Sequence, residues 1–250
     1  MPSDLNRKSY NAIASSWDVA RHSFYGRERD YLDIFLEGLP VPSRILDLGC
    51  GTGRPMAEYI LSRGHDVTGV DEASKLLGLA MRRFPQGNWI ESRIEDFEST
   101  NHFAGVVCWD ALFHIERSLH AGVLLRMGKV LCAGGRLMLT VGGSDHPPFS
   151  DTMFGATFFY DSYPPEETLS LLHRLGLSLS SPSDERTRHR SRQRPLCHCR
   201  ATALEHQEWA TTSPAAADLI LTSNASLPHP YIALGRVART YEKYAKFNCA

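Results

Sequence analysis

The segment from Arg44 to Arg54, Arg-Ile-Leu-Asp-Leu-Gly-Cys-Gly-Thr-Gly-Arg, constrains the fold of this 250-residue chain more than any other. An apolar run, Arg44–Leu48, leads directly into three glycines spaced two residues apart, and we expect a helix from about Pro55. Glycines at such a turn let a ligand lie against the backbone, because no Cβ stands in the way. A second run, Asp66–Asp71, ends on an acid. The pattern predicts two parallel strands with a ligand site at their carboxyl ends.

The spacing of the glycines indicates which kind of ligand this is. Dinucleotide enzymes use Gly-x-Gly-x-x-Gly, whereas this chain has Gly49-x-Gly51-x-Gly53, with Asp47 two residues ahead of the first glycine. The turn also lacks the Lys-Ser/Thr pair of a phosphate-binding P-loop. Asp71, at the end of the second strand, can accept hydrogen bonds from both hydroxyls of a ribose. We therefore expect an adenosine-containing cofactor.

Two segments resemble a known family. Leu46–Gly53 resembles the first motif of class I S-adenosylmethionine (SAM)-dependent methyltransferases, and Asp71 stands where that family places its ribose acid. Cys108–His114 resembles the fourth motif and is most similar to small-molecule enzymes of the trans-aconitate methyltransferase-like group. Judged by motif order, the resemblance covers roughly residues 6–179. It implies SAM as the cofactor and a Rossmann-like α/β fold, a doubly wound, mostly parallel sheet with helices on both faces.

The resemblance also implies which residues hold the cofactor. The glycine turn would pass beneath its methionyl part and ribose, and the loop at residues 92–97 would bind adenine. An acid common in relatives is replaced there by Arg93. The N-terminal helix would lie over the cofactor. Its apolar stripe is explained equally well if the helix only packs against the rest of the domain. The expected cofactor-binding residues are Asp47, Gly49, Cys50, Gly51, Gly53, Asp71, Glu72, Ile94, Glu95, Trp109, Tyr10 and Trp17.

Two residues of the fourth motif are candidates for catalysis. His114 could accept a substrate proton, because an imidazole exchanges protons near neutral pH. Asp110 could orient His114. The alternatives are a structural hydrogen bond for His114 and a cap on the next segment for Asp110. Methyl transfer from SAM requires no metal, and Cys197-x-Cys199 lacks a second ligand pair at zinc spacing, so no metal site is expected.

Strands and helices are expected to alternate along the core, which implies a parallel sheet. Three domains are expected: a helical cap at residues 1–40, a SAM-binding core at 41–180 and an irregular extension at 181–250. The cap would hold a helix over Leu5–His22 and a second within Ser23–Gly38. A helix over about Leu119–Leu131 would end at the glycines that follow. The expected strands are Arg44–Leu48, Asp66–Asp71, Asn88–Glu91, Ala104–Trp109, Arg136–Val141 and Leu175–Ser180.

Two regions depart from this alternation. The insertion Gly142–Tyr163 is rich in aromatic residues, and we expect a long loop that either covers the substrate as a lid or packs its own small cluster. The extension carries six arginines between residues 186 and 200 with little apolar periodicity, which is typical of disorder. This class normally ends in an antiparallel hairpin, for which Leu219–Leu221 and Tyr231–Leu234 are only weak candidates. The C-terminal end is therefore atypical.

Composition restricts the function further. The formal net charge is −1, which gives no reason to expect affinity for nucleic acid or membranes. Six scattered cysteines and a polar N-terminus indicate a reduced, cytoplasmic protein. We expect methyl transfer to an oxygen, nitrogen or sulfur atom of a small-molecule substrate. One alternative is an RNA or DNA methyltransferase that uses the arginine-rich tail, but no base-methylation motif follows the expected strand Ala104–Trp109. The other alternative is a non-catalytic SAM-binding protein.

Overall fold

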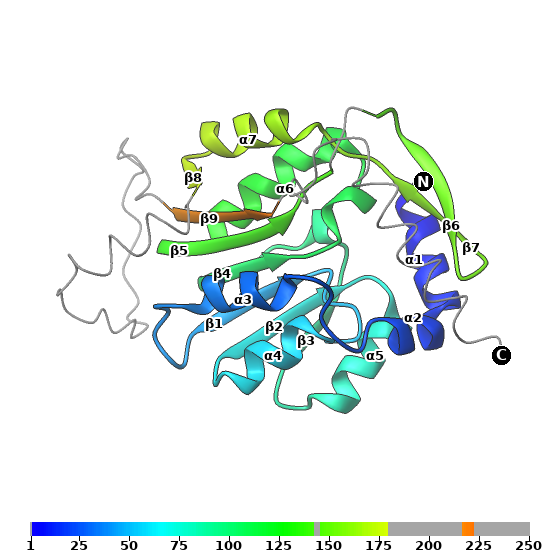
Figure 1. Cartoon of the computed structure of the whole chain (residues 1–250), viewed down its shortest axis with the longest axis horizontal. Coiled ribbons are helices and arrows are strands. Elements are labelled where there is room, and N and C mark those ends of the chain that lie inside the picture. The colour runs from blue at the N-terminus through cyan, green and yellow to red at the C-terminus, as the bar shows by residue number, and fades with distance from the viewer. Residues whose placement is uncertain (1, 143–145, 180–216, 223–250) are drawn as a thin grey trace.

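The computed structural model describes residues 2–142, 146–179 and 217–222, and a seven-stranded sheet forms its centre (Figure 1). The strand order is β3–β2–β1–β4–β5–β9–β8, and every neighbouring pair is parallel. Because the order reverses between β1 and β4, their carboxyl ends open a crevice for a ligand. The strands are β1 Arg44–Leu48, β2 Asp66–Asp71, β3 Asn88–Glu91, β4 Phe103–Cys108, β5 Leu131–Thr140, β8 Leu177–Leu179 and β9 Ala217–Thr222.

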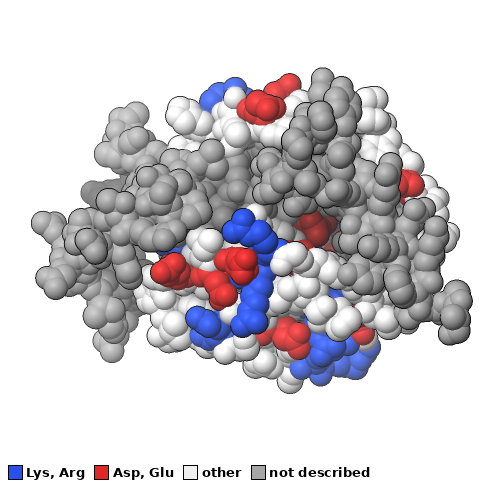
Figure 2. Space-filling view, viewed as in Figure 1, with Lys and Arg blue, Asp and Glu red and all other residues white. Residues whose placement is uncertain are grey.

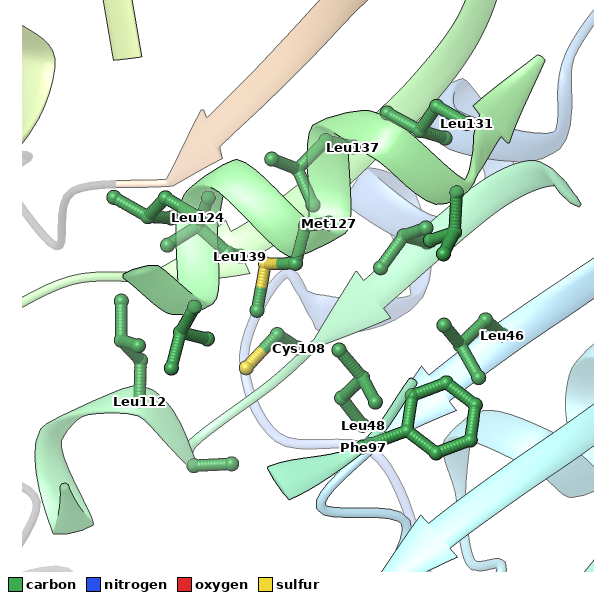
Figure 3. Packing of buried hydrophobic residues seen from close by; sticks show 14 of the residues in the cluster. Leu46, Leu48, Phe97, Cys108, Leu112, Leu124, Met127, Leu131, Leu137 and Leu139 are labelled. Atoms are coloured by element: carbon green, nitrogen blue, oxygen red, sulfur yellow. The ribbon is translucent and has the colours of Figure 1, made fainter. Parts of the chain in front are cut away.

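Helices cover both faces of this sheet (Figure 1). Successive side chains of a strand point to opposite faces, so β1 packs Leu46 against α6 and Ile45 against α3 and α4. The cluster beneath α6, which includes Leu124 and Met127, is shown in Figure 3. The predicted fold class is confirmed. The helices are α1 Pro2–Ala12, α2 Ala14–Ala20, α3 Glu28–Leu36, α4 Met56–Ser62, α5 Ser74–Arg83, α6 Arg117–Val130 and α7 Pro165–Arg174, with short 3₁₀ turns η1 Ile94–Asp96 and η2 Leu112–His114.

The N-terminal cap contains two helices where one was predicted over Leu5–His22. The helix breaks at Ile13, which has φ −98° and ψ 10°. Ile13, Ala14 and Trp17 are nevertheless all buried in one cluster, so the apolar stripe continues across the break. The spacing of apolar residues at every third or fourth position therefore cannot reveal that the helix axis changes direction at this break. The spacing reports which side chains are buried, and burial continues across the break.

The boundary between α6 and β5 also differs from the prediction. The helix ends at Val130, and the strand begins at Leu131 rather than at Arg136. Its pairing with β4 is irregular, because Phe103 pairs with Leu131 while Gly105, two residues later, pairs with Arg136. The glycines predicted to stop the helix lie in this irregular stretch of β5, where Gly134 has φ +73°.

The aromatic insertion forms a hairpin and not a long loop. Strands β6 Phe149–Met153 and β7 Ala156–Tyr160 pair antiparallel, apart from the main sheet. Phe158 is fully buried against Ile13 and Trp17 of the N-terminal cap. A two-stranded hairpin is not stable by itself and needs a surface to pack against, which the cap supplies.

The C-terminal extension was predicted to be irregular, and this is wrong for Ala217–Thr222. These residues form β9, which lies between β5 and β8 and is parallel to both, instead of closing an antiparallel hairpin. Leu219–Leu221 was one of the two candidate segments for a strand. The arginine-rich stretch, Cys197, Cys199 and the other candidate, Tyr231–Leu234, lie outside the described residues.

One buried side chain joins the cap, the hairpin and the core. Asn6 of α1 is 2% exposed. Its Nδ2 donates to the carbonyl oxygens of His114 and Phe159, each at 3.0 Å, and its Oδ1 accepts from the Phe159 N–H at 2.8 Å. A single amide therefore fixes three elements that are far apart in the sequence.

We expect Asn6→Ala to destabilise the protein by about 2–3 kcal/mol, because it removes these hydrogen bonds and leaves a buried backbone donor unpaired. Urea unfolding measures the change. Asn101→Ala, at an exposed loop position, is the matched control and should have almost no effect. Equal stability of the two variants would contradict the role given to Asn6.

Candidate functional site

A cavity opens at the carboxyl ends of β1, β2 and β4 and encloses about 910 Å³ of empty space, counting its open mouth. The two predicted catalytic residues, His114 and Asp110, line it, as do eleven of the predicted cofactor-binding residues: Asp47, Gly49, Cys50, Gly51, Asp71, Glu72, Ile94, Glu95, Trp109, Tyr10 and Trp17. The remaining one, Gly53, does not.

The glycine turn is held against the end of β2. The N–H groups of Gly49 and Cys50 donate to the carbonyl oxygen of Val70 at 2.8 and 3.0 Å. Gly49 has φ +77°, and a Cβ there would lie 2.4 Å from the Cβ of Ala111. Gly53 also has a positive φ, +76°, but a Cβ there would lie 3.0 to 3.2 Å from two aromatic rings that do not line the cavity. Gly49 therefore permits the close approach of the turn to Ala111, and Gly53 shapes the turn.

Asp71 closes this turn from the side of the strand. One carboxylate oxygen accepts from the Gly51 N–H and the other from the Ala73 N–H, both at 2.8 Å. Burial raises the pKa of Asp71 to about 6, although both hydrogen bonds favour the charged form. A carboxylate oxygen has more than one lone pair, so Asp71 can also accept hydrogen bonds from a ligand in the cavity.

Asp47 brings a buried, unsatisfied oxygen to the site. It is 2% exposed, and within the described structure its Oδ2 is buried without a hydrogen-bond partner. Burial, reinforced by the nearby charge of Asp71, raises the pKa of Asp47 to about 7. Leaving a buried carboxylate oxygen unpaired is costly. A ligand with an ammonium group or another strong donor would remove that cost.

Two further acids, Glu95 of the predicted adenine loop and Glu72 after β2, also line the cavity. Glu95 accepts a hydrogen bond from Arg93 Nε at 2.8 Å and a second from the same guanidinium. The residue that departs from the family pattern thus neutralises the acid predicted to meet adenine. Burial raises the pKa of Glu72 to about 7, with further contributions from Glu95 and Asp71.

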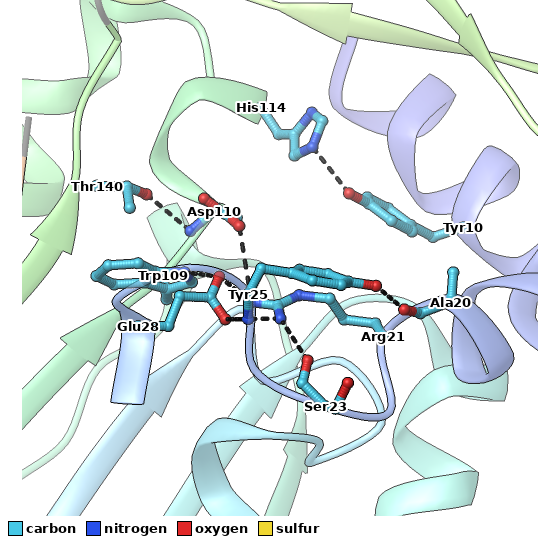
Figure 4. Close-up of polar contacts among 10 residues, drawn as sticks. All are labelled: Tyr10, Ala20, Arg21, Ser23, Tyr25, Glu28, Trp109, Asp110, His114 and Thr140. Carbon is cyan, nitrogen blue, oxygen red and sulfur yellow. Dashed lines mark hydrogen bonds and ion pairs between the residues drawn. The ribbon is translucent and has the colours of Figure 1, made fainter. Parts of the chain in front are cut away.

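Arg21, Glu28 and Asp110 form an ionic network next to Trp109 (Figure 4). Arg21 makes a two-pronged contact with Glu28, at 2.9 and 2.8 Å, and its guanidinium lies 3.8 Å from Asp110. The indole N–H of Trp109 donates to Glu28 at 3.0 Å. Burial is the main cause that raises the pKa of Asp110 to about 6. Arg21 was not predicted as a site residue, because its partners come from other elements.

His114 has a partner on each ring nitrogen. Nδ1 lies 3.0 Å from the carbonyl oxygen of Phe159, and Nε2 lies 2.9 Å from the hydroxyl of Tyr10 (Figure 4). A carbonyl only accepts, so Nδ1 carries the proton and Nε2 accepts from Tyr10. Burial lowers the pKa of His114 to about 4. The predicted orienting role of Asp110 is wrong, since the Phe159 carbonyl holds the imidazole instead.

The family model for a methyltransferase domain matches residues 45–135. This segment runs from the first strand through the glycine turn to the start of β5. The chain contains a methyltransferase domain. The predicted resemblance to class I SAM-dependent methyltransferases of the small-molecule type is confirmed.

Relatives and solved structures agree with this assignment. The Bacillus subtilis protein YqeM is 25% identical to this chain over 66% of this chain and 70% of that protein. Trans-aconitate 2-methyltransferase of Acidovorax ebreus is 30% identical over 48% of each chain, so this chain matches about half the length of that relative. The solved DhpI–SAH complex, 18% identical, shares the fold with a TM-score of 0.58 over 70% of this chain and 87% of its own.

We expect His114 to stay neutral well below its usual titration range. Imidazole ¹⁵N shifts should show the proton on Nδ1 at pH 7 and charging only near pH 4. An unfolded histidine titrates near 6.5, so this residue should cost the folded state stability as pH falls from about 6.5 towards 4. Titration of His114 near pH 6.5 would contradict the assignment.

Proposed function

We propose that the chain binds SAM in this cavity and transfers its methyl group to an oxygen, nitrogen or sulfur atom of a small molecule. The observation that carries the proposal is the unpaired, buried oxygen of Asp47, which lines the cavity together with the glycine turn. SAM carries an ammonium group, a ribose and an adenine, and each has a suitable partner along this wall.

The residues present fit that cofactor. Asp47 would hold the ammonium group, and Asp71, with Glu72 beside it, would hold the ribose hydroxyls. The backbone amide of Ile94 would meet the adenine ring, with Glu95 near its exocyclic amine. The glycine turn, with Cys50, would lie beneath the cofactor, and its remaining surface would be covered by Tyr10, Trp17 and Trp109.

SAM supplies a methyl group on a cationic sulfur, which leaves as a neutral thioether. The contribution of the chain is then mainly to position the nucleophile and exclude water, and such positioning can be worth roughly 7 kcal/mol or more. Asn6 and Tyr10 of the cap line the cavity beside His114, and the hairpin holds the imidazole from behind through a backbone carbonyl. His114 would accept a proton from a nucleophile that must lose one.

The lining of the cavity favours a small substrate over nucleic acid. Its charged side chains include more acids than arginines: Asp47, Asp71, Glu72, Glu95 and Asp110 against Arg21 and Arg54. That excess would repel phosphates. On the face shown in Figure 2, the described Lys and Arg side chains lie among Asp and Glu, unlike a continuous basic stripe. The trans-aconitate relative is named for a small-molecule substrate.

We also propose that the enzyme works in the cytoplasm. Among the described cysteines, Cys50, Cys108 and Cys132 are free thiols, and burial raises the pKa of the first two. Such thiols are typical of a reducing compartment. Within the described residues, none of the helices combines the length and the apolarity that crossing a bilayer requires.

The proposal is tested by calorimetry with SAM and by incubating the enzyme with SAM and metabolite extracts. Binding together with release of S-adenosylhomocysteine is expected. Binding without release would favour a non-catalytic SAM-binding protein, and no binding would contradict the proposal.

We expect Asp71→Ala to weaken SAM binding by about 2–4 kcal/mol, or roughly 30- to 900-fold, because the ribose loses a charged acceptor. Asp66→Ala is the control, since Asp66 is exposed at the opposite end of the same strand. A folded Asp71→Ala protein that binds SAM as tightly as the control would remove Asp71 from the site.

Asp47 should couple SAM binding to proton release. An ammonium partner favours the carboxylate, whereas near and below pH 7 much of the unliganded Asp47 is protonated. Affinity should therefore fall as pH decreases below about 7, by up to roughly tenfold per pH unit. Calorimetry at pH 6 in two buffers of different ionisation enthalpy counts the released protons. The Asp47→Asn variant should release fewer protons when it binds SAM. An unchanged number of released protons would exclude Asp47 as their source.

A further inference from the structure

We propose that Tyr10 is a catalytic residue that takes the substrate's proton and relays its own to His114, and that this relay suits a neutral hydroxyl nucleophile. The product would be a methyl ether. The inference rests on the proposed function and extends it to the methylated atom. It also changes the role of Tyr10 from a cover over the cofactor to a group that meets the substrate.

The relay is rigidly built. The Tyr10 ring makes edge contacts with Trp17, Phe158 and His114 at centroid distances of 5.3, 4.7 and 5.4 Å. Four residues earlier on the same helix, Asn6 donates to the Phe159 carbonyl that also holds the imidazole. Asn6, Tyr10 and His114 all line the cavity. Helix α1 therefore supplies both the tyrosine and the amide that supports its histidine partner.

The hydrogen bonds give the relay a direction. Because the Phe159 carbonyl keeps the proton on Nδ1, the Nε2 of His114 can only accept, and the hydroxyl of Tyr10 donates to it at 2.9 Å. A hydroxyl that donates its proton can still accept one through its oxygen lone pairs. A substrate hydroxyl in the cavity would thus donate to Tyr10, which donates to His114.

The transfer balances along this line. The bond from the substrate oxygen to the methyl carbon forms as the carbon–sulfur bond breaks, and the sulfur keeps that electron pair as a neutral thioether. The hydroxyl proton passes to the Tyr10 oxygen, and the Tyr10 proton passes to Nε2 of His114. The positive charge that began on sulfur ends on the imidazolium, beside the Phe159 carbonyl. After the ether leaves, the proton returns through Tyr10 to water.

The weak basicity of His114 selects the kind of nucleophile. Burial lowers its pKa to about 4, so it can neither ionise a hydroxyl in advance nor take a proton from an alkylammonium product. A hydroxyl oxygen becomes strongly acidic while the methyl group arrives, and even a weak base can then accept its proton. Carboxylates and thiolates are already anions, and a neutral amine attacks through its own lone pair, so none of these needs the relay.

The test uses SAM with a ¹³C-labelled methyl group, the full-length enzyme and a metabolite extract. The carbon shift of the labelled product separates O-, N- and S-methyl groups, and an O-methyl product is expected. Tyr10→Phe should slow its formation at pH 7 by about a hundredfold while SAM affinity, measured by calorimetry, holds within twofold. Tyr160→Phe is the control, because that ring also packs on His114, with a centroid distance of 4.9 Å, and should react at the wild-type rate.

The pH profile distinguishes a relay from a packing role. The rate of Tyr10→Phe should rise about tenfold per pH unit until the substrate hydroxyl ionises, because an oxyanion needs no proton acceptor. His114→Asn should show the same loss and the same recovery. The double variant should be no slower than either single variant, since residues that act as one unit are not additive.

The outcomes separate this inference from the proposed function. Absence of SAM binding or of label transfer would overturn both. An N- or S-methyl product formed by a SAM-binding enzyme would overturn the relay alone. Wild-type turnover by Tyr10→Phe, a parallel pH profile, or additive losses in the double variant would also overturn the relay alone. If Tyr10→Phe loses its fold, the pH profile of His114→Asn decides.

Discussion

The contact between the glycine turn and the end of β2 is the constraint on which the site depends. Two backbone N–H groups of the turn bind the Val70 carbonyl, and a third binds the Asp71 carboxylate. These bonds pull the turn against the sheet, and only glycine at position 49 avoids a collision with Ala111. The same carboxylate is left facing the cavity. One set of hydrogen bonds thus shapes the turn and presents the acid to a ligand.

Without a ligand, the buried acids of this site cost the folded protein stability. Asp47, Asp71, Glu72 and Asp110 are all acids whose pKa values are raised by burial above their ordinary range. Charged carboxyl groups held away from water favour a ligand that brings donors and positive charge. Perturbed acids gathered in one cavity are characteristic of functional sites. The core beneath α6, built from buried apolar side chains, provides the rigid support that such a site needs.

The N-terminal cap supplies several polar side chains to the cavity and to the groups around it. Asn6 holds the hairpin and the end of η2, while Tyr10 reaches the imidazole of His114. Arg21, just after α2, makes the ion pair with Glu28 beneath Trp109. The cap therefore serves as more than a cover, since its polar side chains fix the geometry of the groups that face the cavity.

The sequence by itself determined the part of the protein that local rules describe. Apolar runs and the glycine turn located the strands from β1 to β3 at their observed bounds, and the strand-tip acids were assigned to one site because parallel strands end at one edge. Motif resemblance placed Trp109, Asp110 and His114 at the same cavity. Each of these signals involves residues close together in the sequence, so it can be read without knowing how the chain packs.

Tertiary structure alone decided what depends on distant partners. The break at Ile13 is invisible in the periodicity because burial continues across it, and the aromatic insertion became a hairpin because the cap offered a surface. The Leu219–Leu221 segment joined the sheet in parallel, although the family pattern suggested an antiparallel end. The tautomer of His114 depends on a backbone carbonyl 45 residues away. A sequence fixes which groups a chain carries, but hydrogen-bond partners and burial, which set protonation, exist only once the chain has folded.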